Sequence, residues 1–369
     1  MTIIIFVIVL AVLIFVHELG HFLAARACGV RVDKFKIGFG PKIFAWKNGE
    51  TEYGVNAVPF GGYVKIFGED PNAESTEGPD SKRSFVNKPR WQQAIVLFAG
   101  VFFNFLFAWL LYSVIFTAGT TVATDGFEKY ADRFGDQRIM ITYLEPGSPA
   151  ERAGLEVRDT IQNIGGNEAV SGSEAPLKIE TVQEVINSSG ANPVELEYLR
   201  NGDPNTTEII PAQGIVENKY AIGIAMQNTA NLKLPVFMAI YEGAHYTVVL
   251  TKETAIALYG FVANIFKGQA DFSDVAGPIG IVGIVGNAAE LGFTYLLMIM
   301  AIISINLGII NLIPFPALDG GRILFVAIEG VVRRRIPVKF FNIVNTVGFA
   351  LLMALMVAVT YKDVLKLVK

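Results

Sequence analysis

An apolar run at the start of the chain most constrains what this sequence can fold into. Every side chain from Ile3 to Val16 is aliphatic or aromatic, and the run continues through His17, Glu18 and His21. About 20 such residues form a helix that crosses a bilayer. Histidine and glutamate inside such a helix are costly unless they face a polar interior, so their presence is a functional signal.

The spacing of these polar residues predicts a metal site. His17 and His21 are four residues apart, so both imidazoles lie on one face of a helix and can hold a single zinc ion. Glu18 between them is placed to activate a water molecule, a pattern common among metallopeptidases. A membrane setting for this pattern is uncommon.

A secretory signal peptide is the alternative interpretation of the first segment, because Ala25-Arg26-Ala27 imitates a cleavage site. No basic segment precedes the apolar run, however, and cleavage there would discard both paired histidines. We therefore predict a retained transmembrane helix.

Composition excludes several other classes of protein. Hydrophobic residues make up 52% of the chain and charged residues only 17%, against roughly 25% charged in soluble domains. The net charge of −4 argues against a nucleic-acid binder. The single cysteine, Cys28, excludes a disulfide framework or a multi-thiolate metal site. We expect Cys28 to be a small apolar residue near a helix end rather than a reactive thiol.

Only three histidines are present, so the third ligand must be sought elsewhere. His245 lies in Tyr241–Tyr246, which resembles an amphipathic helix, and we expect it at a surface or interface. The third ligand should then be a carboxylate.

Three further apolar stretches, 94–116, 293–313 and 345–361, make four predicted spans in all. The basic residues of 26–90 place that loop in the cytoplasm, so both termini are expected outside. The chain is thus predicted to be a polytopic α-helical membrane protein with four transmembrane helices. Its predicted parts are the first span 1–26, a cytoplasmic loop 27–90, the second span 91–118, an extracytoplasmic domain 119–230, amphipathic interfacial helices and a Gly-Pro-Ile-Gly loop in 231–290, the third span 291–325, a basic loop 326–339, and the fourth span with its tail 340–369.

A β-hairpin is predicted within the cytoplasmic loop, close to the membrane. Residues 52–58 and 62–67 alternate like strands, and Pro59-Phe60-Gly61-Gly62 between them is a turn signal.

In the second span, Asn104 is the notable polar residue, one turn after Gly100. We expect it to make an interhelical hydrogen bond rather than to act in catalysis.

The domain at 119–230 resembles an α/β PDZ domain. The resemblance rests on Ser148-Pro149-Ala150, Ala153-Gly154-Leu155 and Asp159, in an order of strand, short helix, glycine stop and strand. Ile222-Gly223-Ile224 resembles the glycine loop that binds a peptide carboxylate, although an ordinary turn explains it nearly as well. A bound peptide would add as a strand, with its end held by backbone N–H groups.

The carboxylate candidate follows the third span. Pro314 and Pro316 break that helix just before Asp319, and irregular backbone at this depth survives only where protein or water satisfies it. The first and third spans both run inward, and His17 lies about 20 Å along a core roughly 30 Å thick, so Asp319 reaches a similar depth. Two histidines and a carboxylate leave zinc a position for water. The alternative for Asp319 is a helix cap before Gly320-Gly321.

Taken together, these motifs resemble the site-2 protease family, and most closely its bacterial members of the regulator-of-sigma-E type, which release anti-sigma factors. The matching segments include His17–His21, Asn311 through Gly320, Gly38–Pro41, Gly61–Lys65 and Gly277–Gly280. The resemblance covers essentially the whole chain. Close relatives often carry two PDZ domains, whereas this chain has room for one.

The resemblance implies one zinc ion on His17, His21 and Asp319, with Glu18 as general base. It further implies that Asn311 contacts the scissile carbonyl or the oxyanion and that Asn306 helps to hold the substrate. The strand residues implied to pair with an unwound substrate are Gly62, Tyr63, Val64 and Lys65.

The implied substrates are single-span membrane proteins in the bacterial cytoplasmic membrane, such as anti-sigma factors after a first extracytoplasmic cut, or remnant signal peptides. The PDZ domain would bind the new C-terminus of the cut substrate or act as a size filter. The alternatives are a non-catalytic PDZ scaffold, which would not need the metal motif, and a sporulation-type protease that processes a pro-sigma factor. Proteases of that second type generally lack an inserted PDZ domain.

Overall fold

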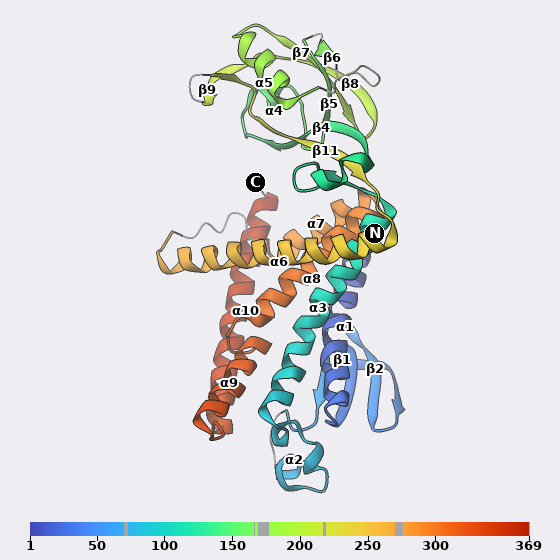
Figure 1. The fold of residues 1–369 in the computed structure, drawn as a ribbon. Coiled ribbons are helices and arrows are strands. Elements are labelled where there is room, and N and C mark those ends of the chain that lie inside the picture. The colour runs from blue at the N-terminus through green and yellow to red at the C-terminus, as the bar shows by residue number, and fades with distance from the viewer. Residues whose placement is uncertain (70–72, 166, 169–176, 217–218, 270–275, 369) are drawn as a thin grey trace. The chain divides into compact units, whose positions relative to one another are not determined.

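Figure 1 shows the computed structural model, which describes residues 1–369 apart from 70–72, 166, 169–176, 217–218, 270–275 and 369. Contacts divide the chain into two compact units. Unit 1 comprises Met1–Ile115 and Val236–Lys369, and unit 2 comprises Phe116–Pro235.

Unit 1 is built on long apolar helices. Within the described residues, five helices of this unit are long and apolar enough to cross a membrane, where four spans were predicted. The four predicted spans are all among them, and α6 is a further candidate by length and composition. The helices of unit 1 are α1 (Thr2–Ala27), α2 (Ala73–Glu77), α3 (Arg90–Ala118, which runs on into unit 2), α6 (Val236–Phe266), α7 (Pro278–Glu290), α8 (Phe293–Leu312), α9 (Asp319–Val332) and α10 (Val338–Val368), with short 3-10 turns at Ser81–Arg83 and Phe85–Asn87.

The additional candidate is α6, a single continuous helix where shorter interfacial helices were expected. It is continuous because no proline interrupts the stretch from Val236 to Phe266. Its most apolar window has a mean hydropathy of 1.3, against 2.2 to 2.8 for the other four, and none of that window is buried. Figure 1 draws α6 across the direction of α3 and α10. The expected Gly277–Gly280 loop is instead the start of α7, where Pro278 occupies the first turn and Asp363 accepts hydrogen bonds from the N–H groups of Gly277 and Gly280.

Two long strands, β1 (Val32–Asn48) and β2 (Thr51–Ile66), follow α1 in the chain and form an antiparallel sheet that packs against it. The predicted hairpin was wrong in its pairing, because residues 52–58 and 62–67 do not pair with each other and a further turn lies at Gly49–Glu50. The first part of β1 lies between the two halves of β2, since Phe35 pairs with both Tyr53 and Val64. Alternation predicts a strand but not its partner, so the two segments were paired with each other instead of with β1.

A cluster of buried apolar side chains fixes this sheet against the helices. The cluster includes Phe22 and Ala25 of α1, Phe35 of β1, Val64 of β2 and Val96 of α3. Close packing of these groups holds β2 beside the first span.

Unit 2 contains both helices and strands. Its main sheet has the strand order β3-β11-β4-β5-β7-β8, β6 pairs with β5, and β9 and β10 form a separate hairpin. Its apolar residues point inward, as in β7, where Val194, Leu196 and Tyr198 are buried while Glu195 and Glu197 are exposed. The elements of unit 2 are β3 (Thr120–Ala123), a 3-10 turn (Glu128–Arg133), β4 (Phe134–Leu144), α4 (Pro149–Arg152), β5 (Thr160–Ile164), β6 (Asn167–Glu168), α5 (Ile179–Ser188), β7 (Val194–Arg200), β8 (Asp203–Ile209), β9 (Ala212–Val216), β10 (Lys219–Ala221) and β11 (Ile224–Leu232).

Candidate active site

The three predicted metal ligands meet at one point of unit 1. The Oδ2 atom of Asp319 lies 3.1 Å from His17 Nε2 and 3.3 Å from His21 Nε2, and the two nitrogens are 3.2 Å apart. Zinc with tetrahedral bonds of about 2.0–2.1 Å separates its ligands by about 3.3 Å. Among the described residues this is the group of histidine, cysteine and acidic side chains spaced to hold a metal ion.

The hydrogen bonds of His21 suit a metal ligand. Its Nδ1 lies 2.8 Å from the carbonyl oxygen of Val96, so Nδ1 carries the proton and donates it there. The lone pair of Nε2 therefore faces Asp319 Oδ2. With His17 in the same tautomer, three acceptor atoms would converge, an arrangement that a cation stabilises.

Asn104 of α3 determines the tautomer of His17. Its side-chain amide lies 3.0 Å from His17 Nδ1, and with Nδ2 toward the ring its buried Oδ1 has no hydrogen-bond partner in the described part of the chain. Amide orientation follows from the hydrogen-bond network. Turning the amide lets Oδ1 accept the Nδ1–H proton and leaves Nε2 of His17 free for a metal. The expected interhelical hydrogen bond is thus confirmed, but its partner is the candidate ligand itself, which sequence reasoning missed.

Glycine permits α1 and α3 to approach closely at this point. A Cβ at Gly20 would lie 2.3 Å from the carbonyl oxygen of Ala99, and one at Gly100 would lie 2.3 Å from His21 Nε2. Only glycine fits both positions without a shift of backbone or ligand. The pair Gly100 and Asn104, one turn apart on α3, was the sequence signal for this contact.

Asp319 is placed by the break between α8 and α9. Leu318 occupies the N-cap position in an extended conformation, so Asp319 begins α9 and is not its cap. Gly320 follows where a Cβ would lie 2.3 Å from the carbonyl oxygen of Leu312. The Ala317 N–H donates to Asn345 Oδ1 of α10 at 3.2 Å, which holds the irregular segment.

Glu18 lies between the metal cluster and strand β2. The N–H of Val64 donates to Glu18 Oε2 at 2.9 Å. Two cavities, of about 310 and 250 Å³, meet here, and both are lined by Glu18 and Asp319. Gly62 and Asn311 line the larger cavity, and Tyr63 and Val64 line the smaller. A reacting peptide group in these cavities would lie beside both the carboxylate and the cluster.

Other predicted residues lie elsewhere. Asn306 donates to the Ile302 carbonyl oxygen of its own helix and does not line either cavity, and neither does Lys65. His245 lies on α6, 3.1 Å from Glu242, and Cys28 is a partly buried residue at the end of α1.

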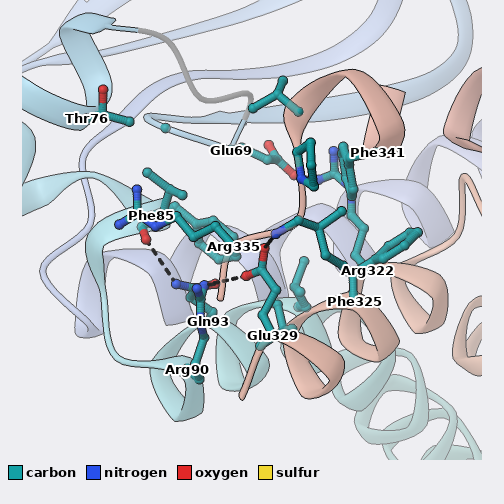
Figure 2. A pocket seen from close by; sticks show the side chains of 17 residues that line it. Glu69, Thr76, Phe85, Arg90, Gln93, Arg322, Phe325, Glu329, Arg335 and Phe341 are labelled. Atoms are coloured by element: carbon teal, nitrogen blue, oxygen red, sulfur yellow. Dashed lines mark hydrogen bonds and ion pairs between the residues drawn. The ribbon is translucent and has the colours of Figure 1, made fainter. Parts of the chain in front are cut away.

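A third cavity, of about 280 Å³, is lined mainly by residues of α3, α9 and α10 (Figure 2). Arg90 and Glu329 form an ion pair of 2.8 Å in it, and Arg322 pairs with Glu69. Glu69 lines both this cavity and the smaller one at the cluster. The Arg322–Glu69 pair therefore forms part of the wall between them.

Comparison with known proteins agrees with this chemistry. The model of peptidase family M50 matches residues 5–355. A protein of Clostridium perfringens is 37% identical over 96% of this chain and 95% of its own length. One from Synechocystis is 34% identical over 97% and 93%, and one from Campylobacter jejuni is 33% identical over 98% and 93%. All three bear the name "putative zinc metalloprotease". The chain is a multi-pass membrane protein that belongs to peptidase family M50, and it is a zinc metalloprotease.

Proposed function

We propose that this protease cleaves single-span membrane proteins within the bilayer, as the regulator-of-sigma-E type does. The observation that carries the proposal is the convergence of His17, His21 and Asp319 beside Glu18, with both histidines on a helix apolar enough to span. A polar cluster in such a helix is stable only if it faces a protein interior and serves a function.

The roles of the residues follow from their positions. Zinc held by His17, His21 and Asp319 would polarise the scissile carbonyl and lower the pKa of a water molecule. Glu18 accepts the proton of the attacking water and passes it to the leaving amine. Asn311, which lines the larger cavity, donates to the developing oxyanion, a contribution of about 3 kcal/mol to the barrier.

The test uses Glu18→Gln, which keeps the shape of the side chain and removes its basicity. In membranes that contain a single-span anti-sigma-type substrate, we expect cleavage to fall at least about 10³-fold with zinc content unchanged. Full cleavage by this variant would overturn the proposed chemistry.

A substrate helix must unwind before cleavage, and its freed backbone groups need partners. We propose that the unwound segment adds as a strand to the outer edge of β2, where Gly62 lies two residues from the N–H that meets Glu18. Gly62→Pro removes an N–H from this edge and is expected to abolish cleavage of a bound substrate. Gly62→Ala adds a similar side-chain contact but keeps the N–H, so equal loss in both variants would contradict the strand addition.

Unit 2 is proposed to be a PDZ domain on the extracytoplasmic side of a bacterial cytoplasmic membrane. Support comes from Ser148, whose hydroxyl caps α4 by accepting from the Glu151 N–H, and from a groove beside Ile222, Gly223 and Ile224. It would screen substrates, either by binding the new C-terminus left by a first cut or by excluding those that keep a bulky outer domain. Fusing a folded domain to the substrate tests the size filter, since an exclusion role predicts loss of cleavage only with unit 2 present.

The orientation depends on α6. We propose that α6 lies at the interface, so that four helices cross and both termini are extracytoplasmic; its low hydropathy and the charges Glu242, Lys252 and Glu253 support this. Labelling of cysteines introduced near each terminus with an impermeant reagent tests it. Labels on opposite sides would make α6 a fifth span.

A further inference from the structure

Unit 2 contains a groove of about 620 Å³ between α5 and β11. The first half of β11, from Ile224, pairs with β4 on one side, and β3 covers the other side only from Thr229 to Leu232. Within the described residues, the outer edge of 224–227 is therefore left without a neighbouring strand, since the Asn228 carbonyl oxygen already accepts from the Thr124 N–H. An open strand edge beside a groove can take a peptide as an added strand.

The groove has an apolar floor and a closed end. Ile222, Ile224 and Met226 line it and belong to or pack against the core of unit 2. The N–H of Tyr220 donates to Asn187 Oδ1 at 3.1 Å, which ties β10 to the end of α5. The floor suits the alternating apolar side chains of an extended peptide.

The walls of the groove are acidic. Glu180, Gln183, Glu184 and Asn187 share one face of α5 by their spacing, and all four line the groove. Glu145 lines the opposite side, and its N–H donates to the carbonyl oxygen of Gly223. The charged residues among the described lining are Glu145, Glu180, Glu184 and Lys219.

Three carboxylates against one ammonium give the groove a negative charge. Glu180 lies in the first turn of α5, where the helix dipole alone would favour it, but neither Glu184 nor Glu145 has that explanation. A free C-terminal carboxylate at the Gly223 loop would lie next to Glu145, which repels it. The charge therefore argues against the terminal carboxylate as ligand.

We propose that this groove binds an internal, extended segment that carries lysine or arginine at alternating positions and adds as a strand to the open edge of β11. Alternate side chains of such a strand point to the same side, so its basic residues would face Glu180 and Glu184 on α5. Exposed charges select a partner and speed its association more than they tighten it. The inference that this groove recognises substrates rests on the proposed function. The inference that it binds a peptide does not.

The test measures fluorescence anisotropy with the full-length chain in detergent. The probe is a short labelled peptide of alternating valine and lysine, acetylated and amidated at its ends. We expect Glu180→Lys combined with Glu184→Lys to weaken binding at least about tenfold. The control, Glu195→Lys with Glu197→Lys, changes net charge equally on the exposed face of β7 and should stay within about twofold.

Three results would overturn the proposal: no binding of the probe, equal weakening by both pairs of variants, or tighter binding of a valine–glutamate peptide or of a free-carboxylate probe. Glu18→Gln should bind the probe as the unaltered chain does. If Glu180→Lys with Glu184→Lys weakens probe binding but leaves substrate cleavage normal, the role of the groove in substrate recognition is overturned alone, whereas full cleavage by Glu18→Gln would overturn the proposed chemistry alone.

Discussion

The two units of this protein use apolar residues in opposite ways. In unit 2, the large apolar side chains Ile141, Ile161 and Leu196 are almost completely buried, and charged residues such as Glu195 and Glu197 are exposed. In unit 1, α10 presents Val347, Phe349 and Leu351 outward, each more than half exposed. The polar residues His17, His21 and Asn104 lie inside it.

The difference reflects the solvent of each unit. Water expels apolar surface, so unit 2 folds around an apolar core. Lipid accepts apolar surface but provides no hydrogen bonds, so polar groups of the spans gain stability only from one another. The metal cluster is thus both the reactive centre of unit 1 and a polar core of its helices.

The largest expected effect comes from removing a metal ligand. His17→Ala or Asp319→Asn should lower zinc content from one ion per chain by more than about tenfold and abolish proteolysis, because two ligands do not complete the site. Zinc is measured by elemental analysis of purified protein, and a chelator should reproduce the loss in the unaltered chain. Glu290→Gln, at an exposed carboxylate of the same unit, serves as control. Unchanged zinc in both ligand variants would place the metal elsewhere.

The next effect tests whether the polar core extends to Asn104. Asn104→Leu removes the acceptor for His17 Nδ1–H and should weaken zinc binding by about 10- to 100-fold. Asn104→Asp keeps an oxygen acceptor and should retain the metal. Competition with a zinc chelator measures both affinities. Equal affinities in the two variants would show that the amide does not position His17.

A third prediction concerns the buried ion pair of unit 2. Asp159 is 1% exposed and accepts from Arg200 Nε at 2.9 Å, from Arg200 Nη2 at 2.7 Å and from the Glu156 N–H at 2.8 Å. Hydrogen bonding to the Asp159 carboxylate raises the pKa of Arg200, so the guanidinium stays charged. Asp159→Ala should destabilise unit 2 by about 3 kcal/mol, because it removes a buried carboxylate that accepts three hydrogen bonds and leaves Arg200 with only its exposed partner Glu156 and the Gly154 carbonyl oxygen.

Limited proteolysis and urea unfolding measure the change, with exposed Glu208→Ala as the control. Zinc content should be unaffected if each unit has its own core. Parallel loss of zinc would show that the stability of unit 1 depends on unit 2.

The smallest effect is expected at an exposed ion pair next to the β1–β2 turn. Hydrogen bonding from Arg83 lowers the pKa of Glu50 below its ordinary value of 4.5. The stabilisation is therefore present above that value and is lost as the pH falls through the lowered pKa. Because both side chains are 44% exposed, it should not exceed about 1 kcal/mol. Thermal unfolding is followed as the pH is lowered. The pH-dependent stabilisation from this ion pair should be missing in Arg83→Gln and present in Lys82→Gln.

Sequence reasoning succeeded where the information is local. A helix repeats every 3.6 residues, so the spacing of His17 and His21 places both on one face whatever surrounds them. Hydropathy identified four of the candidate spans in the same way, because each is a property of one continuous stretch. Asp319 was found through the proline break and the depth that topology implies.

Errors arose where the partner of a segment decides its structure. The residues of β2 alternate as a strand should, but pairing of Phe35 with two distant parts of β2 depends on packing against α1 and α3. The 236–266 stretch carries charges that suggested several short helices, yet it forms one helix.

By itself the sequence determined a membrane protein with two histidines and a glutamate on one turn of an apolar helix. Only the tertiary structure decided that Asn104 holds His17, that Val64 meets Glu18, and that Asn306 lies away from the cavities. The reason is physical: periodicity fixes which way a side chain points from its own helix. Which atom it meets depends on how distant segments pack, and the close approach of α1 to α3 at Gly100 sets that contact here.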